Sequence, residues 1–149
     1  MDTKNQKTYR FAKITMISYS DRIVEVIADE GVQLETEDLE ELVKTIHAIQ
    51  PEVTGYLANR KFRYSFSFSA LQYVMKTKVA DAVAILVHSS LAEQASRFIP
   101  GKNLKFKMKT FRDRDKAMLW LQEIAREKTE VSSSSDPTQI SKTPRQNQG

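Results

Sequence analysis

The chain has 149 residues, a net charge of +4 and no cysteine. This length suits a single domain, and the lack of cysteine excludes disulfides, a cysteine–zinc site and a thiol nucleophile. No apolar run is long enough to span a membrane, and the polar start MDTKNQKTYR lacks a signal-peptide core. We therefore expect a cytoplasmic protein that does not bind membranes.

The first two elements are a predicted antiparallel hairpin. The runs Tyr9–Tyr19 and Arg22–Asp29 are rich in β-branched and aromatic residues, and the polar pair Ser20-Asp21 separates them. A helix capped by Thr36 is predicted next, over Glu37–Gln50, because its apolar residues recur with a 3.6-residue period. These apolar residues are Leu39, Leu42, Val43, Ile46 and Ile49.

The segment after this helix begins as a short interior strand, Glu52–Ala58, and then alternates aromatic with polar side chains from Phe62 to Phe68. Such alternation predicts an extended chain with the aromatic side chains on one side. The motif Ser69-x-x-Gln72 has the form of a capping box, so a helix is predicted to start at Ser69.

Four elements complete the chain. The nearly all-apolar run Val83–Val87 predicts a central strand covered on both faces. A second capping box, at Ser90, predicts a helix over Leu91–Ile99. In the last strand lysines alternate with apolar residues, which is typical of a protected edge strand. The final helix, Arg114–Glu127, is capped by Asp113.

This order of elements predicts an α/β sandwich with a mixed, mainly parallel five-stranded sheet, an N-terminal hairpin and about four helices. From Thr129 onwards the residues are mostly polar and include the serine run Ser132–Ser135. Such a segment buries too little apolar surface to offset its ordering entropy. We therefore predict a folded domain over residues 1–128 and a disordered tail over residues 129–149.

The predicted topology gathers several polar residues at one edge of the sheet. Ligands of open α/β sheets bind beyond the carboxyl ends of the parallel strands, where Asn59, Arg60 and His88 are expected beside the helix starts at Ser69 and Ser90. An arginine and helix N-termini suit an anion. The chain has no phosphate-binding glycine motif, nucleophile elbow or metal-ligand spacing. We therefore predict no enzyme, no metal and no cofactor.

The residues also resemble a known family. The strand Val83–Val87 and the closing motif FxDxDKAxxWL, at residues 111–121, look like those of STAS/SpoIIAA-like domains. The segment Gly55–Arg60 (GYLANR), together with Tyr64-Ser65, is most similar to small uncharacterised SpoIIAA-like proteins of the Bacteroidota. The resemblance covers about Tyr9–Glu127. It implies a SpoIIAA-like fold and a regulatory, protein-interaction role.

SpoIIAA is an anti-sigma-factor antagonist that is switched by phosphorylation of a serine just before a helix. The resemblance implies that Ser69 is the corresponding position, because Ser69-Ala70-Leu71 is similar to the family motif. A phenylalanine stands where the family has an aspartate. Ser69 is thus the candidate phosphorylation site.

Three roles follow from these patterns. The first is a non-catalytic module that binds a protein partner through a rim of six residues, with a homodimer left open. The rim consists of Asn59, Arg60, Tyr64, Ser65, Ser69 and His88. The second is binding of a small apolar or lipid-like ligand in an aromatic pocket. This pocket is predicted from Tyr56, Phe62, Tyr64, Phe66 and Tyr73.

The third and least favoured role is nucleic-acid binding by basic residues near the last strand. These are Lys102, Lys105, Lys107, Lys109 and Arg112. Binding of this kind depends steeply on salt concentration. Protection of a sheet edge explains the same lysines without any partner.

Overall fold

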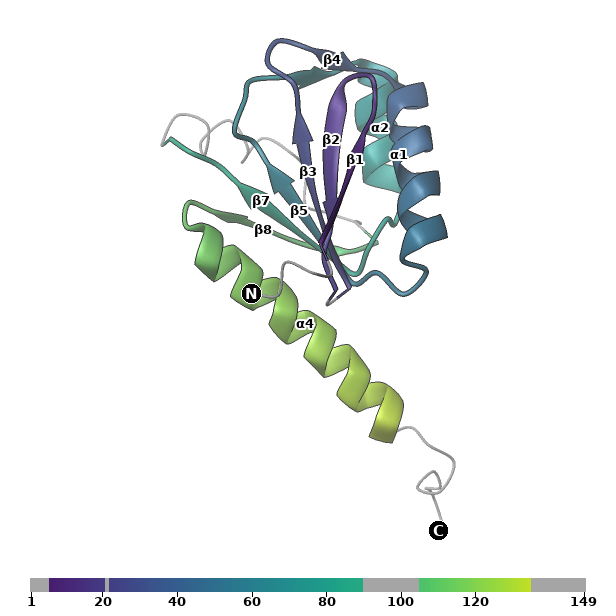
Figure 1. The fold of residues 1–149 in the computed structure, drawn as a ribbon, viewed down its shortest axis with the longest axis vertical. Coiled ribbons are helices and arrows are strands. Elements are labelled where there is room, and N and C mark those ends of the chain that lie inside the picture. Colours follow the sequence, from purple (N-terminus) through teal and green to yellow (C-terminus); the bar gives the residue numbers. More distant parts are fainter. Residues whose placement is uncertain (1–5, 21, 90–104, 135–149) are drawn as a thin grey trace.

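In the part of the chain that the structure describes, six short strands form the main sheet of the protein (Figure 1). The computed structural model describes residues 6–20, 22–89 and 105–134, with residues 129–134 described by their backbone alone. Across the sheet, the strands are β1 (Lys7–Arg10), β2 (Ile14–Ser18), β3 (Ile23–Ala28), β5 (Gly55–Asn59), β7 (Ala82–Leu86) and β8 (Lys107–Phe111). The pairs β1/β2 and β2/β3 are antiparallel, and the three pairs from β3 to β8 are parallel. The predicted α/β class with a mixed, mainly parallel sheet is confirmed.

The sheet has one strand more than the five predicted. The run Tyr9–Tyr19 forms two strands, because the backbone N–H of Phe11 donates to the carbonyl oxygen of Ile14 at 2.8 Å and closes a tight turn. Phe11 and Ala12 continue the apolar pattern through this turn, so the sequence carries no break there. The second hairpin, between β2 and β3, is as predicted.

The two last strands differ in how they are covered. Every residue of β7 is buried, as its apolar sequence predicted. However, β7 is the fifth of six strands, so the predicted central position is wrong. Outside it, β8 is the edge strand and exposes Lys107 and Lys109.

Helix α1 (Thr36–Ile49) packs its apolar stripe against the sheet, with Leu39, Leu42 and Ile46 buried. The predicted cap at Thr36 is wrong by one residue, because the N-cap is Glu35. The backbone N–H of Glu35 donates to Oδ2 of Asp38 at 2.8 Å. A carboxylate three residues into the helix therefore closes the first turn.

A second, two-stranded parallel sheet precedes helix α2 (Phe68–Lys76). It pairs β4 (Gln33–Leu34) with β6 (Ser65–Phe66). Helix α2 starts before the predicted Ser69, because Oγ of Ser67 accepts a hydrogen bond from the backbone N–H of Ala70 at 3.1 Å and caps the helix. Ser69 lies instead in the first turn and is exposed.

The helices lie in two layers, with α1 and α2 on one face of the main sheet and α4 (Arg114–Ser134) on the other (Figure 1). The predicted cap is confirmed, since Oδ1 of Asp113 accepts from the backbone N–H of Asp115 at 2.8 Å. Helix α4 continues seven residues past the predicted end at Glu127. The helix predicted over Leu91–Ile99 and its cap, Ser90, lie outside the described residues. The division into a domain and a disordered tail stays a prediction.

Candidate functional site

On the face of the sheet that carries α1 and α2, the segment that follows β3 is hydrogen-bonded to the segment that follows β5. The backbone N–H of Gly31, a residue with a φ of +78°, donates to the carbonyl oxygen of Arg63 at 2.6 Å, and that of Ser67 donates to Leu34 at 3.0 Å. Glycine adopts this left-handed conformation at little cost. The segment after β5 is thereby held beside the segment after β3.

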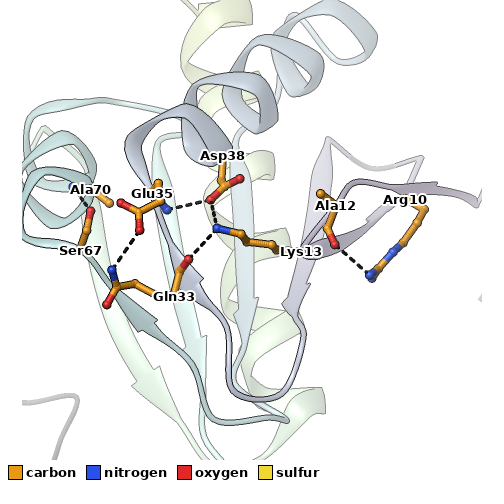
Figure 2. Close-up of polar contacts among 8 residues, drawn as sticks. All are labelled: Arg10, Ala12, Lys13, Gln33, Glu35, Asp38, Ser67 and Ala70. Carbon is orange, nitrogen blue, oxygen red and sulfur yellow. Dashed lines mark hydrogen bonds and ion pairs between the residues drawn. The ribbon is translucent and has the colours of Figure 1, made fainter.

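Figure 2 shows how the start of α1 is fixed to the same region. Nζ of Lys13 donates to the carbonyl oxygen of Gln33 at 2.9 Å and to Oδ2 of Asp38 at 3.0 Å. The side-chain amide of Gln33 donates to Glu35 at 2.9 Å. The turn between β1 and β2 is therefore joined to β4 and to the first turn of α1.

Below these segments lies a cavity of about 110 Å³ between the main sheet and helices α1 and α2. Its lining is mostly aliphatic, with Val26 and Ile85 on the sheet side, Leu42 on α1 and Val74 on α2. Among the described lining residues, the one with a charged side chain is Arg60. The described part of the lining therefore combines an apolar interior with one positive charge.

Arg60 follows directly after β5 and is held against an aromatic ring. Its guanidinium carbon lies 4.4 Å from the centre of the Tyr64 ring, a cation–π distance. Nη2 also donates to the carbonyl oxygen of Tyr64, at a long 3.4 Å. The Tyr64 ring meets that of Phe66 edge-on, with ring centres 5.6 Å apart. These contacts place the guanidinium at the wall of the cavity.

Two tyrosines add hydroxyl groups to the lining. The hydroxyls of Tyr56 and Tyr64 form no hydrogen bond to any residue that the structure describes. Burial raises the pKa of both phenols, which are protonated donors at neutral pH in any case. Both tyrosine side chains are half-buried, and no carboxylate acceptor lies among the described lining residues.

The opposite face of the sheet holds a polar network beneath the start of α4. Glu25 in β3 is buried and accepts two hydrogen bonds from the guanidinium of Arg114, at 2.6 and 2.7 Å. It also accepts from the hydroxyl of Tyr19 at 2.6 Å and from the amide of Asn59 at 2.8 Å. The amide oxygen of Asn59 in turn accepts from Nε2 of His88 at 2.9 Å. Each of the five side chains is thus hydrogen-bonded to at least one other member of the network.

The network sets the protonation of its members. Burial alone would raise the pKa of Glu25, but the hydrogen bonds from Arg114, Tyr19 and Asn59 outweigh it and hold that pKa below its usual value. Burial, together with the hydrogen bond to Glu25, raises the pKa of Tyr19 to about 12. The hydrogen bonds to Glu25 raise the pKa of Arg114. The network therefore holds a carboxylate, a phenol and a guanidinium in fixed charge states.

The six predicted rim residues are divided between the two faces of the sheet. Asn59 and His88 belong to the polar network on the α4 side. Arg60 lines the cavity on the α1/α2 side, so its side chain and that of His88 lie on opposite faces although they leave neighbouring strands. Ser65 and Ser69 are exposed, in β6 and in the first turn of α2. The six residues therefore do not form one continuous patch.

The five residues predicted for an aromatic pocket lie closer together than the six rim residues do. Four of them, Tyr56, Tyr64, Phe66 and Tyr73, line the cavity. Phe62 is not among its lining residues and is 39% exposed. The basic residues proposed for nucleic acid are exposed where they are described, near β8; Lys102 lies outside the described residues.

Sequence reasoning missed three members of the network: Tyr19, Glu25 and Arg114. The signal for Glu25 is a single charged residue inside the apolar strand Ile23–Ala28. A charge in such a strand needs a partner from elsewhere in the chain. Arg114, the first residue of α4, is that partner.

Two further searches of the described residues gave negative results. Histidine, aspartate and glutamate side chains do not gather there in any group of three or more that could hold a metal ion. None of the described helices is long and apolar enough to cross a bilayer.

Comparison with known proteins gave a family and a fold. Residues 17–125 match the family described as Domain of unknown function (DUF7793). The chain is similar to the crystal structure of an uncharacterized protein from the DUF3478 family with a SpoIIAA-like fold, from Shewanella loihica PV-4. The TM-score is 0.51 at 20% sequence identity, over 78% of this chain and 91% of the other. No curated protein matches the chain. The similarity confirms the SpoIIAA-like fold.

Proposed function

We propose from its geometry that this chain, which belongs to the DUF7793 family and has a SpoIIAA-like fold, is a non-catalytic module that binds a small apolar ligand. Neither the family nor the fold names a reaction. The ligand occupies the cavity between the main sheet and helices α1 and α2. The module works in the cytoplasm.

The observation that supports this proposal is the cavity itself. Native interiors are close-packed and hold few voids larger than a water molecule. A cavity of about 110 Å³ that is partly open to solvent, with Leu42, Val74 and Ile85 in its lining, is larger than such voids. An apolar cavity of comparable size, about 150 Å³, takes up benzene in an engineered protein. The cavity thus has the size and the lining of a site for one small apolar molecule.

The test uses the full chain and benzene as a neutral probe, followed by methyl-group NMR. We expect shifts for the methyl groups of Val26, Leu42 and Ile85, which line the cavity, and none for those of Leu119, an exposed residue of α4. Absence of any shift at the cavity methyls would contradict the proposal.

Two variants make this test sharper. Ala58→Phe fills the cavity from β5, and Val43→Phe fills it from α1. Each should abolish the benzene-induced shifts, whereas Leu119→Phe, a surface change, should preserve them. Binding that survives in a folded filling variant would place the probe elsewhere and refute the proposed site.

A second candidate function, binding of a protein partner, rests on a different observation. Phe68 at the start of α2 is 77% exposed and Phe62 is 39% exposed, and Ser69 beside Phe68 is exposed as well. Exposed aromatic side chains are favoured at protein interfaces. A phosphate on Ser69 would lie at a helix N-terminus, where the dipole stabilises negative charge. This surface therefore suits a regulatory contact of the kind that the SpoIIAA resemblance implies.

The two functions are separated by pull-down with matched surface variants. Phe68→Ser and Ser69→Asp should each remove a specific partner that wild type retains. The control is Leu119→Ser, which removes an exposed apolar side chain from α4 on the other face. Partners that respond equally to Phe68→Ser and Leu119→Ser would argue against this surface.

A further inference from the structure

We infer that the ligand of this cavity is a small organic monoanion, an aromatic or short-chain carboxylate whose charged end pairs with Arg60. This inference deepens the proposed function and rests on it. The hydrocarbon part of the ligand lies among the aliphatic side chains between the sheet and the two helices. The carboxylate lies at the wall formed by Arg60, Tyr56 and Tyr64.

The first argument concerns charge. The structure shows no ion pair between Arg60 and any carboxylate of a described residue, and its hydrogen bond to Tyr64 is long, at 3.4 Å. A guanidinium carries five N–H donors in a planar fork that matches a carboxylate. The arginine side chain is fixed over the Tyr64 ring, so little further ordering is needed when an anion binds.

The second argument concerns the two hydroxyls. Tyr56 and Tyr64 line the cavity together with Arg60, and neither hydroxyl donates to a described residue. A phenol is protonated at neutral pH, and burial raises the pKa of both further, so each hydroxyl can donate a hydrogen bond. Three groups of the lining are thus donors, and no carboxylate side chain is among the described lining residues. Donors without acceptors select a ligand that brings its own acceptor oxygens.

The third argument concerns size. A volume of about 110 Å³ is smaller than the ~150 Å³ cavity that takes up benzene, so it suits a hydrocarbon part of no more than about six non-hydrogen atoms. Benzoate and hexanoate meet this limit. A long acyl chain such as that of palmitate exceeds it, so a membrane lipid is not the expected occupant.

Isothermal titration calorimetry of the full chain tests the inference with ligands of equal shape. Benzoate, neutral benzamide and cationic benzylamine differ in the charge of one group. We expect benzoate to bind at least tenfold more tightly than either of the others. In Arg60→Met the affinity for benzoate should fall at least tenfold. The control, Arg63→Met, changes an arginine whose side chain is 97% exposed and that does not line the cavity, and should bind as wild type does.

The outcomes separate the inference from the proposed function. If benzamide binds as tightly as benzoate, the inference that the ligand carries a carboxylate is wrong, whereas the proposed apolar site remains. Palmitate binding more than tenfold tighter than hexanoate would overturn the size limit. Failure of every probe, benzene included, would refute the proposed function as well. The comparison of benzoate with benzamide needs only wild-type protein, so it decides the question even if Arg60→Met does not fold.

Discussion

The polar side chains on the two faces of the sheet differ in whether they have hydrogen-bond partners. On the α4 side, a carboxylate, a phenol, an amide and a guanidinium satisfy one another within 2.6–2.9 Å. On the α1/α2 side, Tyr56 and Tyr64 place hydroxyls in the lining of an apolar cavity with no acceptor among the described residues. The same sheet thus carries one closed polar network and one open set of donors.

The two faces also differ in packing, which is closer on the α4 side than on the α1/α2 side. A Cβ atom added at Gly55, in β5, would lie 3.1 Å from Ile23 and 3.2 Å from Leu121 of α4. On the other side of the same strand, Ala58 faces the cavity. The comparison teaches that α4 is fixed to the sheet by close packing and by charge, whereas α1 and α2 leave room. Binding is therefore expected where the polar groups are unsatisfied, and stability where they are satisfied.

The largest expected effect comes from breaking the network. Arg114→Met leaves the buried carboxylate of Glu25 without its cation, and we expect the free energy of unfolding to fall by about 3 kcal/mol. This lies at the low end for a buried pair because the Arg114 side chain is 40% exposed. Urea denaturation measures the change. Arg10→Met, which removes the arginine of the exposed pair with Asp29, should cost far less. Equal losses would show that the network adds nothing.

A matched pair of tyrosine variants compares the faces directly. Tyr19→Phe removes a hydrogen bond to a carboxylate and should lower the free energy of unfolding by about 2 kcal/mol. Tyr56→Phe removes a hydroxyl that has no described acceptor and should leave stability unchanged or raise it by up to about 1 kcal/mol. Thermal unfolding of both variants checks this. A loss at Tyr56 as large as that at Tyr19 would contradict the comparison.

A pair of alanine variants tests packing. Ala84 in β7 is buried against α4, whereas Ala58 in β5 lines the cavity. Ala84→Val should lower the free energy of unfolding by about 1–3 kcal/mol through overpacking. Ala58→Val places its methyl groups in existing space, so stability should stay the same or rise by up to about 1 kcal/mol. Denaturant unfolding of the two variants side by side gives the answer, and a larger loss at Ala58 would argue against a native void.

The smallest effect is a dependence on pH. The folded-state pKa of Glu25 is lowered from its ordinary value of 4.5, so the contribution of this group to stability is complete above that value. It is lost as the pH falls through the folded-state pKa. The difference in unfolding free energy between wild type and Glu25→Gln should therefore shrink as the pH falls below about 4.5. Arg60→Met should show the same acid limb as wild type, because no carboxylate side chain is among the described cavity residues.

Much of the fold could be predicted because local sequence decides it. The stripe that includes Leu42 and Ile46 identifies α1, and Asp113 marks the start of α4. The missed features depend on contacts between distant segments. The turn at Phe11 closes without glycine or proline, and Ser67 caps α2 although the motif at Ser69 has the better spacing. Backbone hydrogen bonds that the β6 segment donates to the β4 segment fix that choice, and sequence alone does not show them.

The site was predictable only in part, for a geometric reason. The sequence indicated the residues after β5 as important, and aromatic alternation pointed to Tyr64 and Phe66 in the cavity wall. Consecutive residues of a strand point to opposite faces. The side chains of Asn59 and Arg60 therefore lie on opposite faces of the sheet, that of Asn59 toward Glu25 and that of Arg60 toward the cavity. Assigning each to a face required the register of β5 against β3 and β7, which tertiary pairing sets.

The bond between Glu25 and Arg114 has a consequence for protein synthesis, because the two residues are 89 positions apart. While the ribosome is still translating the middle of the chain, the nascent strand β3 already carries a carboxylate whose cation has not been made. The early strands therefore gain little from burying that residue until the last helix has emerged. The polar network on the α4 side can therefore close only after Arg114 has been made.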